Sequence, residues 1–198
     1  MSKTSSEIWD AARAAARAHA VRRMEPDALL PASVLIPLIQ LDGEPHVVLT
    51  VRSFDVEHHK GEISFPGGTM DAGDADLRAT ALRESFEEVG IDPSHVEILG
   101  EISHYVTRTG FHITPYVGIV NRAPYTYEAN PSEVAQILEV PLSHLLDLQN
   151  TEERRVQRDG REVRMRSYRW GEHLIIGATA MMLRSFLDEV AAQLGLEC

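Results

Sequence analysis

Three glutamates stand close together in the segment RESFEEVG, residues 83 to 90. Glu84, Glu87 and Glu88 have the spacing i, i+3 and i+4, which places side chains on one face of a helix. Like charges at this spacing repel one another, and the chain already has a formal net charge of −11. Hard divalent cations prefer oxygen ligands, and Mg²⁺ commonly binds a few carboxylates together with substrate phosphates. The spacing therefore indicates either a metal-binding face or a solvated acidic surface.

A loop with two adjacent glycines, FPGGTMDAGD, comes just before these glutamates. Glycines let the backbone approach a ligand closely, and a carbonyl there could complete the ligand shell of a metal. The helix that follows is predicted to begin after Asp74 or Asp76 and to end at Gly90. Its face opposite the glutamates is expected to pack in the core through four apolar residues, Ala79, Leu82, Phe86 and Val89.

The rest of the chain must position this helix, and it is predicted to contain strands and helices that do not alternate regularly. An Ala- and Arg-rich helix capped by Ser5 or Ser6 is predicted over residues 5–23. A short helix is expected over 140–146, and an amphipathic helix over 177–195. Runs of β-branched residues predict strands at 32–41, 46–52, 96–106 and 112–120. This order favours an α+β domain, with helices on a mixed sheet, over a doubly wound fold.

Composition is typical of one soluble domain of 198 residues. The acidic balance argues against a nucleic-acid partner. The only cysteine is Cys198, so no intramolecular disulfide is possible and a reducing, cytoplasmic compartment is expected. The longest apolar run, ALLPASVLIPLI, is too short for a membrane span, and the N-terminus has no apolar signal core. A small molecule is therefore the expected partner.

The segment GGTMDAGDADLRATALRESFEEVGI resembles the Nudix box, and the matching residues are Gly68, Asp74, Arg83, Glu84, Glu87, Glu88 and Gly90. The gap between Asp74 and Arg83 is one residue longer than in the general box, which is a feature of the coenzyme A pyrophosphatase branch. Upstream, LTVRSFDVEHHKGEISFPGG is similar to a second signature of that branch, with Glu57 where the family has arginine. The resemblance covers about residues 30–185.

The resemblance implies an α/β/α sandwich with a mixed sheet and the Nudix helix. It makes residues 1–198 a single Nudix hydrolase domain, with a core over 30–185 and an N-terminal helical extension over 1–28. It also implies an enzyme that uses Mg²⁺ or Mn²⁺ to hydrolyse a nucleoside diphosphate linked to another moiety. Arg83 would orient the glutamates, and the general base would be Glu84 or Glu133. The implied metal ligands are Glu84, Glu87, Glu88 and the carbonyl of Gly68.

The substrate implied by the branch is coenzyme A or an acyl-coenzyme A, cut to 3′,5′-ADP and 4′-phosphopantetheine or its acyl form. The expected substrate contacts are Arg52, Ser53, His58, His59 and Gly67. Two alternatives stay open: a Nudix pyrophosphatase for ADP-ribose, NADH or a dinucleoside polyphosphate, and a nucleotide sensor without turnover. The intact set Arg83, Glu84, Glu87 and Glu88 favours an enzyme over a sensor.

Seven arginines gather near the C-terminal end of the chain, at positions 154, 155, 158, 161, 164, 166 and 169. The surrounding sequence predicts a β-hairpin that turns at Asp159 and Gly160. The arginines could attract the 3′-phosphate of coenzyme A, or they could form a solvated strand face or a subunit contact. This hairpin and the N-terminal helix are both able to serve a homodimer.

Overall fold

The structure is a computed structural model that describes residues 3–24, 29–54, 60–158 and 161–196. Its main sheet is built around β1 (Leu30–Leu41), which pairs in parallel with β7 (Phe111–Val120) along one edge. The other edge of β1 is shared by β4 (Gly67–Thr69) near its start and by β2 (Glu44–Arg52) near its end, both antiparallel. The start of β1 therefore places the glycine loop beside the centre of the sheet.

Short strands complete this sheet on both sides. β2 also pairs with β3 (Ile63–Ser64) and β8 (Val134–Pro141), while β7 also pairs with β5 (Val96–Glu101) and β6 (Tyr105–Val106). The single strand predicted over 96–106 is thus two strands, because the chain leaves the ladder at residues 102–104. Parallel and antiparallel pairs in one sheet, with helices outside it, confirm the predicted mixed-sheet α+β fold.

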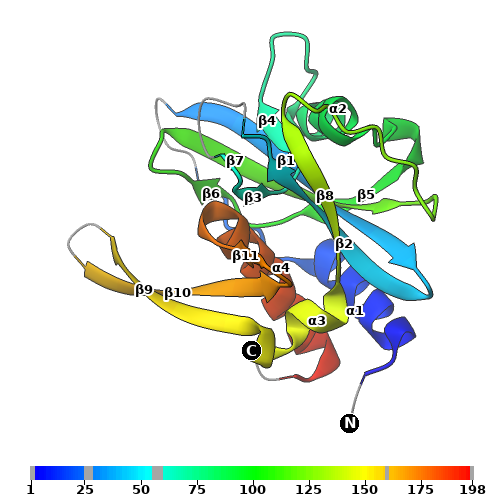
Figure 1. Cartoon of the computed structure of the whole chain (residues 1–198), viewed down its shortest axis with the longest axis vertical. Helices are drawn as coiled ribbons and strands as arrows, with labels where there is room; N and C mark the ends of the chain where they lie inside the picture. Colours follow the sequence, from blue (N-terminus) through cyan, green and yellow to red (C-terminus); the bar gives the residue numbers. More distant parts are fainter. Residues whose placement is uncertain (1–2, 25–28, 55–59, 159–160, 197–198) are drawn as a thin grey trace.

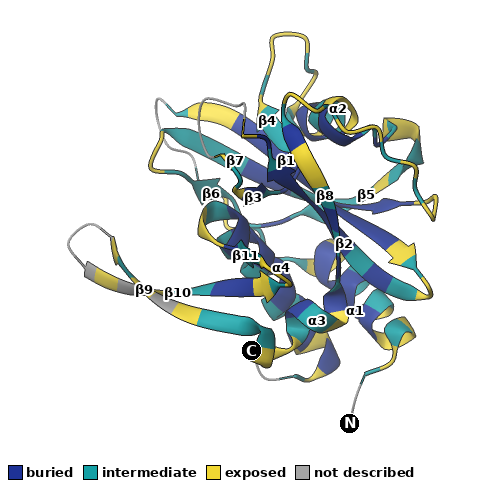
Figure 2. Cartoon of the chain, viewed as in Figure 1, coloured by how far each residue is buried: buried dark blue, intermediate teal, exposed yellow. Residues whose placement is uncertain are grey.

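Helices cover both faces of the main sheet (Figure 1). On one face α1 (Ser5–Ala18) and α4 (Gly177–Leu194) pack over buried residues such as Leu38. On the other face α2 (Leu77–Val89) packs over Ile39, because successive residues of a strand point to opposite faces. Figure 2 shows the buried residues concentrated along β1 and β2, between these layers. Within the described residues, no helix is long and apolar enough to cross a membrane.

The N-terminal helix differs in its bounds from the prediction. Its N-cap is Thr4 and neither serine: the Thr4 hydroxyl accepts from the Glu7 N–H at 3.3 Å, and the Glu7 carboxylate accepts from the Thr4 N–H at 2.8 Å. This capping box outcompetes the serines because it satisfies two backbone donors at once. The helix ends at Ala18, where His19 turns to bond Ser103 at 2.9 Å.

The arginine-rich segment is a hairpin, as predicted, with strands β9 (Thr151–Arg158) and β10 (Arg161–Trp170). A third strand, β11 (His173–Ile175), completes a separate small sheet that projects from the main body (Figure 1). Its turn at residues 159–160 lies outside the described residues. Three of its arginines pair with glutamates of the same hairpin: Arg155 with Glu162, Arg164 with Glu153, and Arg169 with Glu152. These arginines are therefore already partnered by carboxylates.

Three short helical turns join the longer elements. α3 (Leu142–Leu146) follows β8, and its residues Leu142 and Leu145 are buried in the main core. A 3₁₀ turn at Pro93–His95 follows α2, and another at Leu148–Asn150 leads into β9. The α3 turn confirms the short helix predicted over 140–146, and α4 confirms the predicted C-terminal helix.

Candidate functional site

The glutamate-bearing helix α2 is fixed at both ends by local chemistry. Asp76 is its N-cap, since its carboxylate accepts a hydrogen bond from the Ala79 N–H at 2.8 Å. Gly90 ends it with φ 73°, a left-handed conformation that favours glycine. Of the two aspartates that the sequence offers as caps, the second is the cap, so Asp74 is left free for another role.

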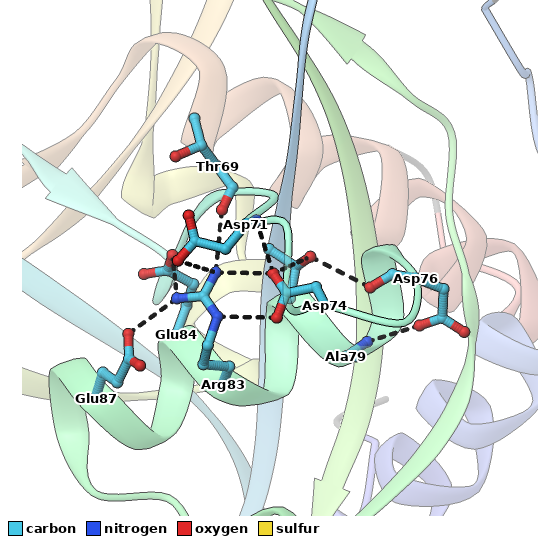
Figure 3. Close-up of polar contacts among 9 residues, drawn as sticks. Thr69, Asp71, Asp74, Asp76, Ala79, Arg83, Glu84 and Glu87 are labelled. Carbon is cyan, nitrogen blue, oxygen red and sulfur yellow. Dashed lines mark hydrogen bonds and ion pairs between the residues drawn. The ribbon is translucent and has the colours of Figure 1, made fainter.

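Arg83 is the centre of the polar network on α2 (Figure 3). Its guanidinium makes a bidentate contact with Asp74, through Nε and Nη2 at 2.9 Å each. Its Nη1 donates to Glu84 and to Glu87, both at 2.9 Å. Its Nη2 also donates to the Thr69 carbonyl of β4 at 3.0 Å. One arginine thus ties two of the glutamates to the glycine loop, which supports the orienting role expected for it.

Asp74 anchors this arginine from the loop before α2. Besides Arg83, its carboxylate accepts hydrogen bonds from the Asp71 N–H and the Thr80 hydroxyl, each at 2.9 Å. The Arg83 contact holds the pKa of Asp74 well below its usual range, and the same pair raises the pKa of Arg83. Both groups therefore stay charged under all physiological conditions. The contacts that Asp71, Thr69 and Thr80 make with Asp74 or Arg83 could not be predicted from the sequence. The sequence indicates only that an arginine has several donors that need acceptors.

The three glutamates do not share one environment. Glu87 is half exposed, whereas Glu88 exposes only 5% of its surface and packs with the sheet-facing side of the helix. Conversely Phe86, which the sequence places in the core, is 53% exposed. The prediction of a core-facing Phe86 was wrong because α2 meets the sheet through smaller residues, Ala81 and Ser85. The helix is rotated so that one glutamate points inward.

Glu88 is the most perturbed acid of the site. Burial raises its pKa to about 8, and the nearby charges of Glu84 and Glu133 act in the same direction, against the opposing effect of Arg52. Its Oε2 atom is buried and has no hydrogen-bond partner among the described residues. Unsatisfied buried polar atoms are rare in native structures, and a bound ion or water molecule is one explanation for such an atom.

Glu84 and Glu133 lie within electrostatic reach of each other and of Glu88. Burial is the main cause that raises the pKa of Glu84, while the Arg83 contact lowers it. Glu133 precedes β8 and is half-buried, and its backbone carbonyl accepts a hydrogen bond from the Ser53 N–H at 2.7 Å. Two elements far apart in sequence, α2 and the start of β8, thus contribute carboxylates to one acidic region.

The two glycines of the loop lie where a side chain would collide. A Cβ on Gly68 would approach the Glu84 carboxylate to 2.5 Å, and a Cβ on Gly67 would strike the Ser33 carbonyl and the Val34 Cα. The Gly67 N–H also interacts with the Glu88 carboxylate. The backbone of this loop therefore approaches two of the glutamates as closely as the sequence suggests.

Arg52 and Ser53, at the end of β2, come from the upstream signature. The Arg52 charge acts on Glu88, and the Arg52 Nε is buried with no hydrogen-bond partner in the part of the chain that the structure describes. Ser53 is buried beside Glu133, to whose backbone it is bonded. The structure thus brings Arg52, Ser53, Gly67 and Glu133 to the box glutamates. Glu57, His58 and His59 lie outside the described residues.

Carboxylates and a close backbone match the oxygen ligands that divalent cations prefer. As the side chains stand, no group of three or more His, Cys, Asp or Glu residues within the described ranges forms a ready-made cation site. Figure 3 shows that Arg83 binds the carboxylates of Glu84 and Glu87. The unpaired Oε2 of Glu88, next to Glu84 and the glycine loop, nevertheless fits a cation ligand. Glu84, Glu87, Glu88 and the Gly68 carbonyl therefore stay the expected metal ligands.

Comparison with known proteins agrees with this arrangement. The family model described as NUDIX domain matches residues 29–163, so the chain belongs to the Nudix family. A Nudix hydrolase named NudL, from Enterobacter sp. (strain 638), is 40% identical over 84% of this chain and 83% of the relative. The NudL protein of Photorhabdus laumondii is 38% identical over 80% of this chain and 84% of its own length. The chain is therefore a Nudix hydrolase similar to the NudL proteins, and Nudix hydrolases generally use divalent metal ions and act on small nucleotides.

Solved structures support the fold. A MutT protein from Methanosarcina mazei Go1 aligns with a TM-score of 0.54 and 16% identity, covering 85% of this chain and 98% of that protein. A MutT/nudix family protein from Enterococcus faecalis aligns with a TM-score of 0.55 and 14% identity over 88% of this chain and 70% of that protein. At these identities the likeness concerns the fold alone.

Proposed function

We propose that this chain is a divalent-metal-dependent diphosphatase that cuts coenzyme A or an acyl-coenzyme A into 3′,5′-ADP and the 4′-phosphopantetheine product. The observation that carries the proposal is the position of Arg52. This residue belongs to the upstream signature, its charge acts on the buried Glu88 of the box helix, and its Nε has no hydrogen-bond partner among the described residues. Arg83 is already bound by Asp74, Glu84 and Glu87, so the Arg52 guanidinium is the positive group that we expect to contact an anionic diphosphate.

The chain's own residues divide the work of binding and orientation. Asp74 fixes Arg83, and Arg83 positions Glu84 and Glu87, so the carboxylates are held before any ligand arrives. A divalent ion bound there would neutralise the charge of the diphosphate and lower the pKa of a water molecule. Arg52 and the Gly67 backbone would hold the substrate from the side of the upstream signature. Such hydrolysis depends mainly on positioning and electrostatics.

Glu133 is the general base that we favour, ahead of Glu84. Glu84 is less available as a general base, because its carboxylate already accepts a hydrogen bond from Arg83 at 2.9 Å. Glu133 has no side-chain partner among the described residues, yet it is close enough to affect the pKa of Glu84 and of Glu88. We expect Glu133→Gln to lower kcat with little change in KM, whereas Glu84→Gln should also weaken metal binding.

Product chromatography tests the substrate. Coenzyme A, ADP-ribose, NADH and diadenosine tetraphosphate would be incubated with the protein and Mg²⁺ or Mn²⁺, and the products separated. We expect 3′,5′-ADP from coenzyme A as the fastest product. Absence of 3′,5′-ADP, together with rapid AMP release from ADP-ribose or NADH, would reject coenzyme A and favour a pyrophosphatase for another nucleotide. No turnover of any compound would favour the sensor.

Two matched variants test the metal assignment separately from the substrate. Glu87→Gln and Glu88→Gln should each lower kcat at least about 100-fold on the best substrate, the scale of losing one strong electrostatic stabiliser. Folding should persist, because each change removes a negative charge from an acidic region. Arg155→Gln, in the distant hairpin, is the control. Near-wild-type rates for either glutamate variant at saturating Mg²⁺ would contradict the assignment.

A further inference from the structure

A hollow, here called the flank hollow, lies beside the C-terminal end of α2. It is lined by residues of the segment 90–95 and of the loop 121–128, which passes this end of the helix (Figure 1). Its volume is about 340 Å³, within the range of small-molecule sites. Phe86 lines it and is about 200° around the helix from Glu84, at 3.6 residues per turn. A ligand in this flank hollow would therefore not occupy the acidic side of α2. The Glu128 N–H holds the loop to the Val89 carbonyl at 3.1 Å.

Two aromatic rings form the wall of the flank hollow. Phe86 is 53% exposed, an unusual position for a large apolar side chain on a helix that packs on a sheet. Tyr125 is held rigidly, since its hydroxyl accepts from the Asp92 N–H at 2.9 Å and lies 3.2 Å from the Gly90 carbonyl. Its ring also contacts those of Tyr127 and His95, with centroids 5.3 and 5.8 Å away. One fixed ring and one uncovered ring suit a planar ligand, because stacking favours every aromatic base.

Charged groups complete the wall. Arg122 is exposed, and within the described residues its guanidinium forms no ion pair, so it is available to an anion such as a phosphate. Asp92 and Glu128 line the same hollow, and the Asp92 carboxylate also accepts a hydrogen bond from the Ser94 N–H at 2.8 Å. Carboxylates accept hydrogen bonds from the exocyclic amines of bases. An aromatic ring, an exocyclic amine and a phosphate occur together in a nucleotide whose base carries an amine.

We propose that the flank hollow is a second nucleotide site, which takes a nucleoside monophosphate whose base carries an amine. The base lies on Phe86 and Tyr125, and the phosphate lies at Arg122. This site is not lined by Glu84, Glu87 or Glu88, and it does not depend on the proposed diphosphatase activity. A bound nucleotide would nevertheless contact the helix that carries Glu87.

AMP is the probe, because it has no phosphoanhydride to be hydrolysed. Its binding would be measured by titration calorimetry in EDTA, which removes divalent ions from the acidic side. We expect Phe86→Ala to weaken AMP binding about 10-fold or more, the scale of losing a stacking partner. Phe86→Leu, which keeps bulk without a ring, should weaken it similarly, and Arg122→Gln several-fold. Leu148→Ala, at another exposed apolar residue, should leave binding unchanged.

Two further measurements locate the AMP. Ring-proton shifts of Phe86 and Tyr125 during the titration would support the flank hollow. Arg52→Gln should not affect AMP binding there, so a loss caused by this variant, with Phe86→Ala unchanged, would overturn the proposal. Ribose 5-phosphate should bind more weakly than AMP. If it binds equally well, the site recognises only an anion, and the nucleotide proposal is wrong.

Discussion

The burial of Glu88 makes the stability of the metal-free protein depend on pH in an unusual direction. Its pKa in the folded chain is about 8, against 4.5 for an ordinary glutamate. Between these values the folded state binds more protons than the unfolded state, so unfolding releases protons. The free energy of unfolding therefore falls as the pH rises from 4.5 to 8. The free-energy cost of burying an ionised Glu88 is absent below pH 4.5, where Glu88 is protonated in both the folded and the unfolded state.

Glu88→Gln removes this titration while keeping the size of the side chain. At 1.36 kcal/mol per pKa unit, the variant should be more stable than the wild type by about 1 kcal/mol at pH 5 and about 3 kcal/mol at pH 7. A chain of this size changes its Tm by roughly 2–4 °C per kcal/mol, so the Tm advantage should grow by about 4–8 °C between these pH values.

Thermal melts in EDTA at pH 5, 6 and 7 measure this difference directly. Glu87→Gln is the matched control, since Glu87 is half exposed on the same helix and should show no such growing advantage. A Tm difference for Glu88→Gln that stays constant from pH 5 to pH 7 would refute the reasoning. The reasoning would also be refuted if the wild type were more stable than Glu88→Gln at pH 7. That result would mean that burial of ionised Glu88 does not destabilise the folded protein.

Three other substitutions have expected outcomes. Gly67→Ala should lower the free energy of unfolding by about 1–3 kcal/mol in denaturant melts, because its Cβ meets the backbone of β1, whereas Gly73→Ala, with open space around it, should not. Asp74→Asn should lower kcat at least about 10-fold with a smaller effect on KM, because Arg83 loses its bidentate carboxylate. Arg155→Gln should change Tm by less than about 2 °C, since its ion pair with Glu162 is exposed.

Local sequence patterns predicted much of the fold. The cap signals around α2, the β-branched runs of β1, β2 and β7, and the amphipathic C-terminal helix each depend on neighbouring residues, so they can be read without knowing the tertiary structure. The same holds for the box itself, whose glycines and glutamates stand at fixed spacings. These patterns were enough to predict the mixed-sheet fold and the family.

Competition between similar local signals was harder to predict. Thr4 rather than Ser5 or Ser6 caps α1, because only Thr4 has a glutamate three residues later whose carboxylate returns to the cap. Asp76 rather than Asp74 caps α2, because Asp74 is bound by Arg83. In both cases a second partner decides which of several similar residues forms the cap.

The sequence by itself determined that an arginine and three glutamates lie on one helix, and that a glycine loop precedes this helix. Only the tertiary structure decided how that helix is rotated. Helical spacing gives the angles between side chains but not the direction of the sheet, and here the small residues Ala81 and Ser85 allow close packing. That contact turns Glu88 inward toward Arg52 and Phe86 outward into the flank hollow. The buried acid and the exposed ring both result from the packing of α2 on strands that are distant in the sequence.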